Sequence, residues 1–249
     1  MIKLPSRLRP KQGFAHFFHL GLVALIPLIV FVLVRQELFS IALAAILLSK
    51  WRIFAVRPRH WLAHVRTNAV DIIFSLSILA FMTSTSFLWV QLLWVLVYEA
   101  WVLYLKPRSS PLFVTMQALI AQLVGLVALF VAFEDVLTSV YIVGAAAILY
   151  YSARHFFASF EEPNYQAYSA TWTLFGASLT WILSHWLLFY GPVAQLAVLL
   201  SVIGYGLAIL YYLAETDKLS KLVQRQVVFV IVAVVTVLLA LSKWKIETI

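Results

Sequence analysis

The chain has 249 residues and a net charge of +8; 64% of its residues are hydrophobic and only 11% are charged. Its mean hydropathy is +0.98. A water-soluble domain of this length needs a polar surface that this composition cannot supply, so we expect a polytopic membrane protein. The apolar runs are about 20 residues long and lack strict alternation, which favours an all-α bundle of transmembrane helices over a barrel.

About nine apolar segments are predicted to span the membrane as a single integral domain, residues 1–249. A basic cytoplasmic arm, 1–13, precedes the bundle, 14–244. The segment 38–56 is expected to be short, tilted or re-entrant, because Lys50 and Arg52 cut its clean apolar part to about a dozen residues. Eight spans is the alternative if 38–56 or the last segment does not cross. In chain order the segments are 14–34, 38–56, 67–84, 87–105, 111–133, 136–159, 167–190, 193–213 and 227–242.

The basic residues predict the orientation of this bundle. With nine spans, three of the 18 lysines and arginines fall outside, namely Arg35, Lys243 and Lys245. The others fall inside: four in the arm, five in 50–66, two at 106–108, one at 154 and three in 218–225. The positive-inside rule therefore predicts a cytoplasmic N-terminus and an external C-terminus in the cell (plasma or inner) membrane.

The same basic charge is expected to meet the lipid bilayer and its anionic head groups on the cytoplasmic side, and not nucleic acid. A membrane-protein partner or a homo-oligomer is left open. Cysteine is absent, which removes disulfides and thiolate sites. The histidine pairs His16 and His19, and His60 and His64, have no acid at ligand spacing, so neither a metal nor another cofactor is expected.

Acidic residues inside the apolar segments are the first candidates for a site, because a charge at the bilayer centre costs about 2.5–3.5 kcal/mol. Asp71 lies about one turn into 67–84 and shares a helix face with Asn68. Glu99 lies seven residues before Lys106, about 10 Å along a helix. The later segments bring further polar side chains to a similar cytoplasmic level, namely Gln117, Arg154 and His155.

These residues predict a polar lining for an ion or a small polar solute in a small permease or channel-like protein. A structural ion pair of Glu99 or Asp71 with Arg154 is the alternative. A second class is an enzyme acting on lipid head groups at the cytoplasmic interface, although no catalytic residue is assigned and a non-enzymatic role is favoured. Its phosphate-holding candidates are Arg52, Arg57 and Arg59. A third class is a non-catalytic membrane assembly partner.

Overall fold

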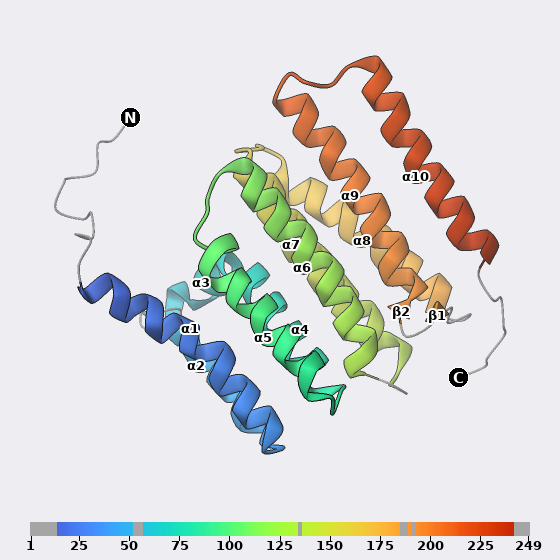
Figure 1. Ribbon diagram of the computed structural model, residues 1–249. Coiled ribbons are helices and arrows are strands. Elements are labelled where there is room, and N and C mark those ends of the chain that lie inside the picture. Colours follow the sequence, from blue (N-terminus) through green and yellow to red (C-terminus); the bar gives the residue numbers. More distant parts are fainter. Residues whose placement is uncertain (1–13, 52–56, 134–135, 185–188, 191–192, 242–249) are drawn as a thin grey trace.

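The computed structural model describes residues 14–51, 57–133, 136–184, 189–190 and 193–241 (Figure 1). Each of the nine predicted segments coincides with a helical element of this part of the chain. These are α1 (Phe14–Arg35), α2 (Phe39–Ser49), α4 (Ala69–Thr83), α5 (Leu88–Ala100) continued by the π-helical turn η4 (Trp101–Leu105), α6 (Pro111–Ala132), α7 (Thr138–Ser159), α8 (Tyr165–Ser184), α9 (Gln195–Glu215) and α10 (Lys221–Leu241).

Among the described residues, four helical segments are long and apolar enough to cross a membrane: Leu88–Leu105, Pro111–Ala132, Gln195–Glu215 and Lys221–Leu241. A bent pair, Pro58–Thr67 with Ala69–Thr83, raises the number to five if it counts as one span. These helices indicate a protein embedded in a membrane. With its 11 residues, α2 covers only about 16 Å of the roughly 30 Å of hydrocarbon. Length and apolar character therefore do not support nine spans.

Three helix boundaries differ clearly from the predicted ones. Helix α10 begins at Lys221 and not at 227, so Lys221 and Arg225 lie in the helix and not in the preceding loop. Helix α2 ends at Ser49, so the predicted segment 38–56 was too long; residues 52–56 lie outside the described part. Helix α8 ends at Ser184, and the last two residues of the predicted helix instead form the strand β1 (Phe189–Tyr190). This strand pairs antiparallel with β2 (Val193–Ala194), and Tyr190 lies opposite Val193.

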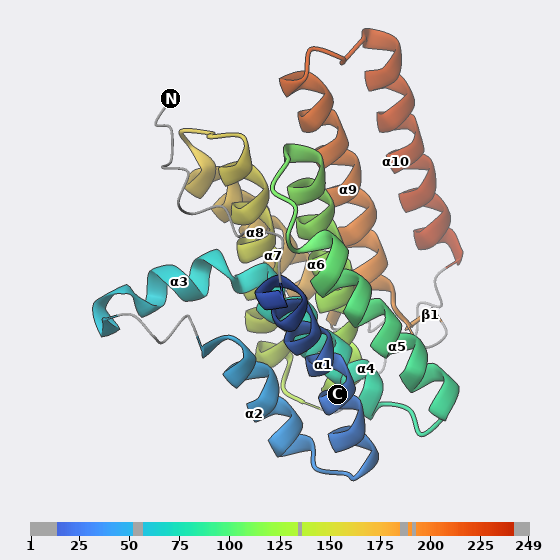
Figure 2. The same ribbon diagram turned by 60° about the vertical axis from the view of Figure 1, so that its left-hand side comes forward.

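Helix α6 lies at the centre and packs against α4, α7 and α9. One apolar core joins it to α1, α2, α4 and α5 through residues such as Ile46, Phe74 and Ile78. A second core, on its other side, contains Leu126, Leu149 and Leu200. The bundle is thus built as two groups of helices that share α6, as Figures 1 and 2 show.

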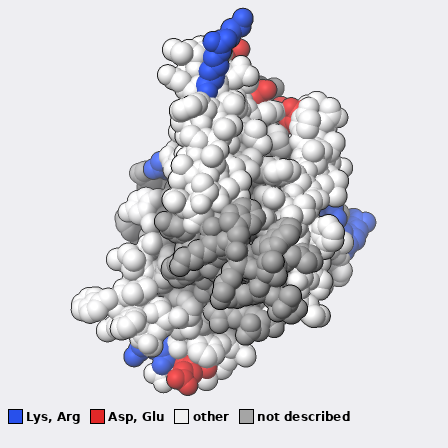
Figure 3. Space-filling view, turned by 90° about the vertical axis from the view of Figure 1, so that its right-hand side faces the viewer, with Lys and Arg blue, Asp and Glu red and all other residues white. Residues whose placement is uncertain are grey.

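The outer surface of the bundle is largely apolar. Helix α10 packs against α9, and none of its described residues is buried. Among the described residues on the face shown in Figure 3, most are uncharged, and the charged side chains lie toward the ends and edges of that face. Side chains such as Phe229 (73% exposed) have no protein cover within the described residues, which fits contact with acyl chains.

Candidate functional site

Asp71, in the first turn of α4, is the centre of a buried charge cluster. Its Oδ2 accepts hydrogen bonds from Lys50 Nζ and from Lys106 Nζ, the latter at 2.7 Å. Its Oδ1 accepts one from Trp101 Nε1 at 3.1 Å. Both carboxylate oxygens are therefore engaged, by groups from the end of α2 and from η4 and the residue that follows it.

The π-helical turn explains how two donors from one helix reach the same carboxylate. Lys106 N donates to Trp101 O over 2.9 Å, five residues back. In an α-helix, positions five apart are rotated by about 140°, whereas in a π turn they stand one above the other. The Trp101 ring also stacks on Phe74 of α4, with centroids 3.9 Å apart, which fixes the indole beside Asp71.

The two lysines differ in exposure. The Lys50 side chain is 8% exposed and the Lys106 side chain is 40% exposed. With both ammonium groups charged, the cluster carries one net positive charge. Lys106 is the most exposed member of the three charged residues. Because a desolvated carboxylate is stable only when it is paired and hydrogen-bonded, the cluster holds α2, α4 and η4 together.

The other predicted site residues have different partners. Gln117 Nε2 donates to Leu105 O (2.6 Å) and Arg108 O (2.9 Å), while its Oε1 lies 3.1 Å from His155 Nε2, so α6 and α7 are joined at this level. Asn68 caps the bend between α3 (Trp61–Thr67) and α4, where its Nδ2 donates to His64 O at 2.8 Å.

The structural ion pair with Arg154 is not formed. Arg154 instead donates to Tyr150 (3.4 Å) and Tyr165 (3.5 Å), and its guanidinium lies over the Tyr165 ring. Glu99 is half-buried and makes no hydrogen bond or ion pair with another described residue. The structure thus brings Gln117 and His155 together but joins neither Glu99 nor Arg154 to Asp71.

The candidate phosphate-holding residues lie apart from this cluster. Arg57 and Arg59 are exposed near the start of the 3-10 helix η3 (Pro58–His60), and Arg59 Nε donates to His60 Nε2 at 2.9 Å. Arg52 lies outside the described residues.

The sequence pattern marked Lys50 and Lys106 only as indicators of membrane orientation. Both lysines could have been predicted as candidate partners of Asp71, because each lies at the predicted cytoplasmic end of an apolar helix, at the membrane depth assigned to Asp71.

A second candidate site is an apolar pocket of about 500 Å³ between α6, α7, α8 and α9. Its walls include Tyr168 and Phe175 of α8 (each 45% exposed) and Leu207 of α9 (49% exposed). Because α8 and α9 touch only weakly, the pocket is open on this side. This pocket could not be predicted from the sequence, because its mostly apolar lining residues come from four helices.

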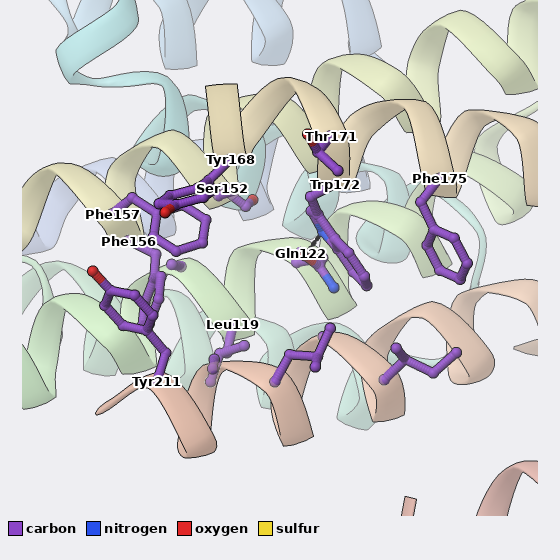
Figure 4. Close-up of a pocket in the computed structure, with 16 residues that line it drawn as sticks. Leu119, Gln122, Ser152, Phe156, Phe157, Tyr168, Thr171, Trp172, Phe175 and Tyr211 are labelled. Carbon is purple, nitrogen blue, oxygen red and sulfur yellow. Dashed lines mark hydrogen bonds between the residues drawn. The ribbon is translucent and has the colours of Figure 1, made fainter. Parts of the chain in front are cut away.

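One polar bridge crosses the pocket wall (Figure 4). Gln122 Oε1 accepts a hydrogen bond from Trp172 Nε1 at 3.1 Å, and its Nε2 donates to Leu200 O at 3.2 Å. This bridge needs the glycine at 204, because a Cβ there would lie 2.6 Å from Gln122 Nε2 and 3.0 Å from Trp172 Cζ2. The amide thus links α6, α8 and α9 where their backbones approach closely.

Ser152 of α7 lines the pocket, is 2% exposed, and its Oγ has no hydrogen-bond partner. Many other helical hydroxyls bond a carbonyl one turn back, as Ser75, Ser169 and Thr180 do at 2.6–2.7 Å. Ser201 of α9 is a second buried hydroxyl without a partner, but it does not line the pocket. A buried hydroxyl without a partner costs about 1–3 kcal/mol. A polar group inserted into the pocket could remove that cost.

The pocket has an aromatic end, where Figure 4 shows Phe156, Phe157, Tyr168 and Tyr211 gathered together with Ser152. Tyr211 contacts both phenylalanine rings edge-on, with centroids 5.5 and 5.2 Å away. Its hydroxyl donates to Glu162 Oε2 at 2.6 Å, in the turn that joins α7 to α8. The pocket is therefore apolar along its length and polar at one end.

Comparison with known proteins supplies no relative. No family model matches the chain, and no curated protein and no solved structure is significantly similar to it.

Proposed function

We propose that this protein binds a lipid-like, amphipathic molecule in the pocket between α6 and α9. The observation that carries the proposal is the buried, unpartnered Ser152 hydroxyl in the wall of an apolar cavity. Ligand pockets are typically 300–1,000 Å³, mostly apolar, with a few placed polar groups, and this pocket of about 500 Å³ matches that description.

The chemistry of the pocket narrows the class of molecule. The apolar body of the ligand would lie between α8 and α9, where exposed lining residues leave an entrance. Its polar head would lie at the aromatic end of the pocket, where it would meet the Ser152 hydroxyl near Tyr211. A small inorganic cation finds no carboxylate among the lining residues, whose polar side chains are the hydroxyls of Ser152, Tyr168, Thr171 and Tyr211 and the already bonded Gln122 and Trp172.

The test uses a palmitic acid analogue that carries a photoreactive diazirine. We expect its crosslinks to concentrate on α6–α9 and to fall severalfold in Thr171→Trp, because Thr171 is an exposed lining residue and indole would fill the entrance. Leu174→Trp, on the same helix but outside the pocket lining, is the matched control. Crosslinks spread evenly over the apolar surface, α10 included, would overturn the proposal.

The small permease predicted from the sequence is a second proposal, supported by Glu99. A half-buried carboxylate without a partner among the described residues is a reasonable group to bind a cation during transport. Asp71 suits that role less, because both its oxygens are engaged. Flux of a cation into proteoliposomes should be lost in Glu99→Gln; unchanged flux in that variant would remove Glu99 from the proposal.

We also propose the nine-span topology with the N-terminus in the cytoplasm. It is supported by the helices that match the nine predicted segments and by the gathering of most basic residues at or near alternate helix ends. Because the chain has no cysteine, single cysteines report the side of each loop directly. Ser109→Cys and Lys218→Cys should react only from the cytoplasm, and Ser86→Cys and Ser139→Cys only from outside. Any exchange between these pairs refutes the topology.

A further inference from the structure

The ten residues Pro58–Thr67 form a continuous helical segment, η3 followed by α3, which is bent by 68° from α4. Figure 2 shows α3 projecting sideways from the bundle. The bend falls three residues before Asp71, whose bond to Lys106 places it level with the end of η4. If α4 stands along the membrane normal, η3 and α3 lie close to the membrane plane at the end of the bundle.

The segment has two distinct faces. At about 100° per residue, four apolar side chains fall on one arc, and the opposite arc carries the basic and polar side chains. Leu62, in the apolar arc, is 69% exposed, and the main contact of α3 with the rest of the described bundle is to α4. The apolar arc holds Pro58, Trp61, Leu62 and Val65; the polar arc holds Arg59, His60, Ala63, His64, Arg66 and Thr67.

The charge around this segment has one sign. No acidic residue occurs in the sequence between Glu37 and Asp71, whereas Arg57, Arg59 and Arg66 are all exposed. An amphipathic helix with a basic polar face and Trp or Leu on the other is the pattern that lies in a membrane interface and favours anionic lipid. A protein partner would need an acidic face that matches these arginines, whereas an anionic bilayer offers phosphate charges over its whole surface.

We propose that η3 and α3 form an interfacial helix that lies in the head-group layer and binds an anionic bilayer surface. Leu62 and Val65 point into the acyl boundary, while Arg59 and Arg66 contact lipid phosphates. This surface is independent of the pocket between α6 and α9. It gives Arg59, a candidate phosphate-holding residue of the enzyme hypothesis, an anchoring role instead of a catalytic one.

The test places one nitroxide label at a time on the cysteine-free chain, in full-length protein reconstituted into phosphatidylcholine vesicles with or without phosphatidylglycerol. We expect Leu62→Cys and Val65→Cys labels to collide preferentially with oxygen, and Ala63→Cys and His64→Cys labels with a water-soluble nickel chelate. Equal nickel access at all four positions would overturn the proposal, as would oxygen access at all four, which a membrane-crossing segment predicts. A Leu62 label shielded from both reagents would indicate a protein partner and also overturn it.

The charge dependence is tested by Arg59→Gln combined with Arg66→Gln. In vesicles with phosphatidylglycerol, this double variant should lose part or all of the oxygen preference at Leu62, and Lys at both positions should restore it. Arg225→Gln, which removes a charge from α10, is the matched control and should leave the Leu62 label unchanged. An equal preference with and without phosphatidylglycerol would refute the anionic-lipid contact.

Discussion

Lys106 Nζ lies 2.7 Å from Asp71 Oδ2, and on the same oxygen Asp71 also accepts a hydrogen bond from the more deeply buried Lys50. One carboxylate thus accepts hydrogen bonds from two ammonium groups, one at the end of α2 and one just after η4. Removing the acid leaves two like charges together in a low-dielectric site, whereas removing one lysine leaves a neutral pair. The cluster therefore responds very differently to the loss of each member.

We predict that Asp71→Asn destabilises the folded protein by about 3–5 kcal/mol, the range found when a buried ionic group loses its partner. Lys50→Met should cost clearly less, because Asp71 keeps Lys106 and Trp101 as partners. The measurement is unfolding by a denaturing detergent in mixed micelles, followed by circular dichroism.

The double variant Asp71→Asn with Lys50→Met is the decisive control. Since it removes one charge of each sign, it should recover part of the stability lost in Asp71→Asn, with a coupling of up to about 3 kcal/mol. Additive losses would show that the lysines and the acid do not act as one cluster. Lys218→Met, a loop lysine that no described acid contacts, should leave stability nearly unchanged.

The helices themselves were largely predictable, because a run of about 20 apolar residues leaves few alternatives in a membrane. The start of α6 at Pro111 and the end of α7 at Ser159 agree with the predicted bounds. The predicted ends of α2 and α8 and the predicted start of α10 were wrong. Apolar residues such as Phe189 and Tyr190 fit a short strand as readily as a helix, and the polar first turns of α10 carry no hydropathy signal. Hydropathy reports burial or lipid contact and not local backbone geometry.

The partners of Asp71 could not be predicted in the same way. Lys50 and Lys106 are 21 and 35 positions away, and no hydropathy pattern says which helices are neighbours. The π turn that aligns Trp101 with Lys106 has no sequence signature in this segment. An ion pair of Arg154 with Asp71 or Glu99 was the alternative suggested by their similar depth in the membrane, but depth does not fix the direction in which a side chain points around the bundle.

Trp101→Phe should separate the two roles of the indole. Phenylalanine can keep the stack on Phe74 but loses the 3.1 Å hydrogen bond to Asp71 Oδ1. Hydrogen bonds between membrane helices average about 0.6 kcal/mol, so we expect a loss of that order in the same unfolding measurement. Trp101→Leu, which removes both contacts, should cost more. Equal losses in the two variants would mean that the hydrogen bond carries the whole effect.

Gly204→Ala should destabilise the bundle by about 1–3 kcal/mol, because the added methyl group would press against Gln122 and Trp172. Gly21→Ala is the matched control, since a Cβ at that position meets nothing within 4 Å. The control should be neutral or stabilising by up to about 1 kcal/mol, as alanine favours helix over glycine. Thermal unfolding in detergent compares them. The same sign of change in both variants would contradict a close approach at Gly204.

Ser152→Ala distinguishes a ligand site from ordinary packing. The substitution removes a buried hydroxyl with no partner, so it should stabilise the delipidated protein by up to about 1–3 kcal/mol. The same substitution should weaken retention of the diazirine fatty acid, because the ligand loses its hydrogen bond. Ser169→Ala is the control, since that hydroxyl already bonds Tyr165 O at 2.6 Å. We expect it to leave retention unchanged and to cost about 0.6 kcal/mol of stability for the lost hydrogen bond, instead of stabilising the protein. Because stability and retention move in opposite directions only when the hydroxyl serves a ligand, Ser152→Ala lowering both would assign Ser152 to the packing of α7.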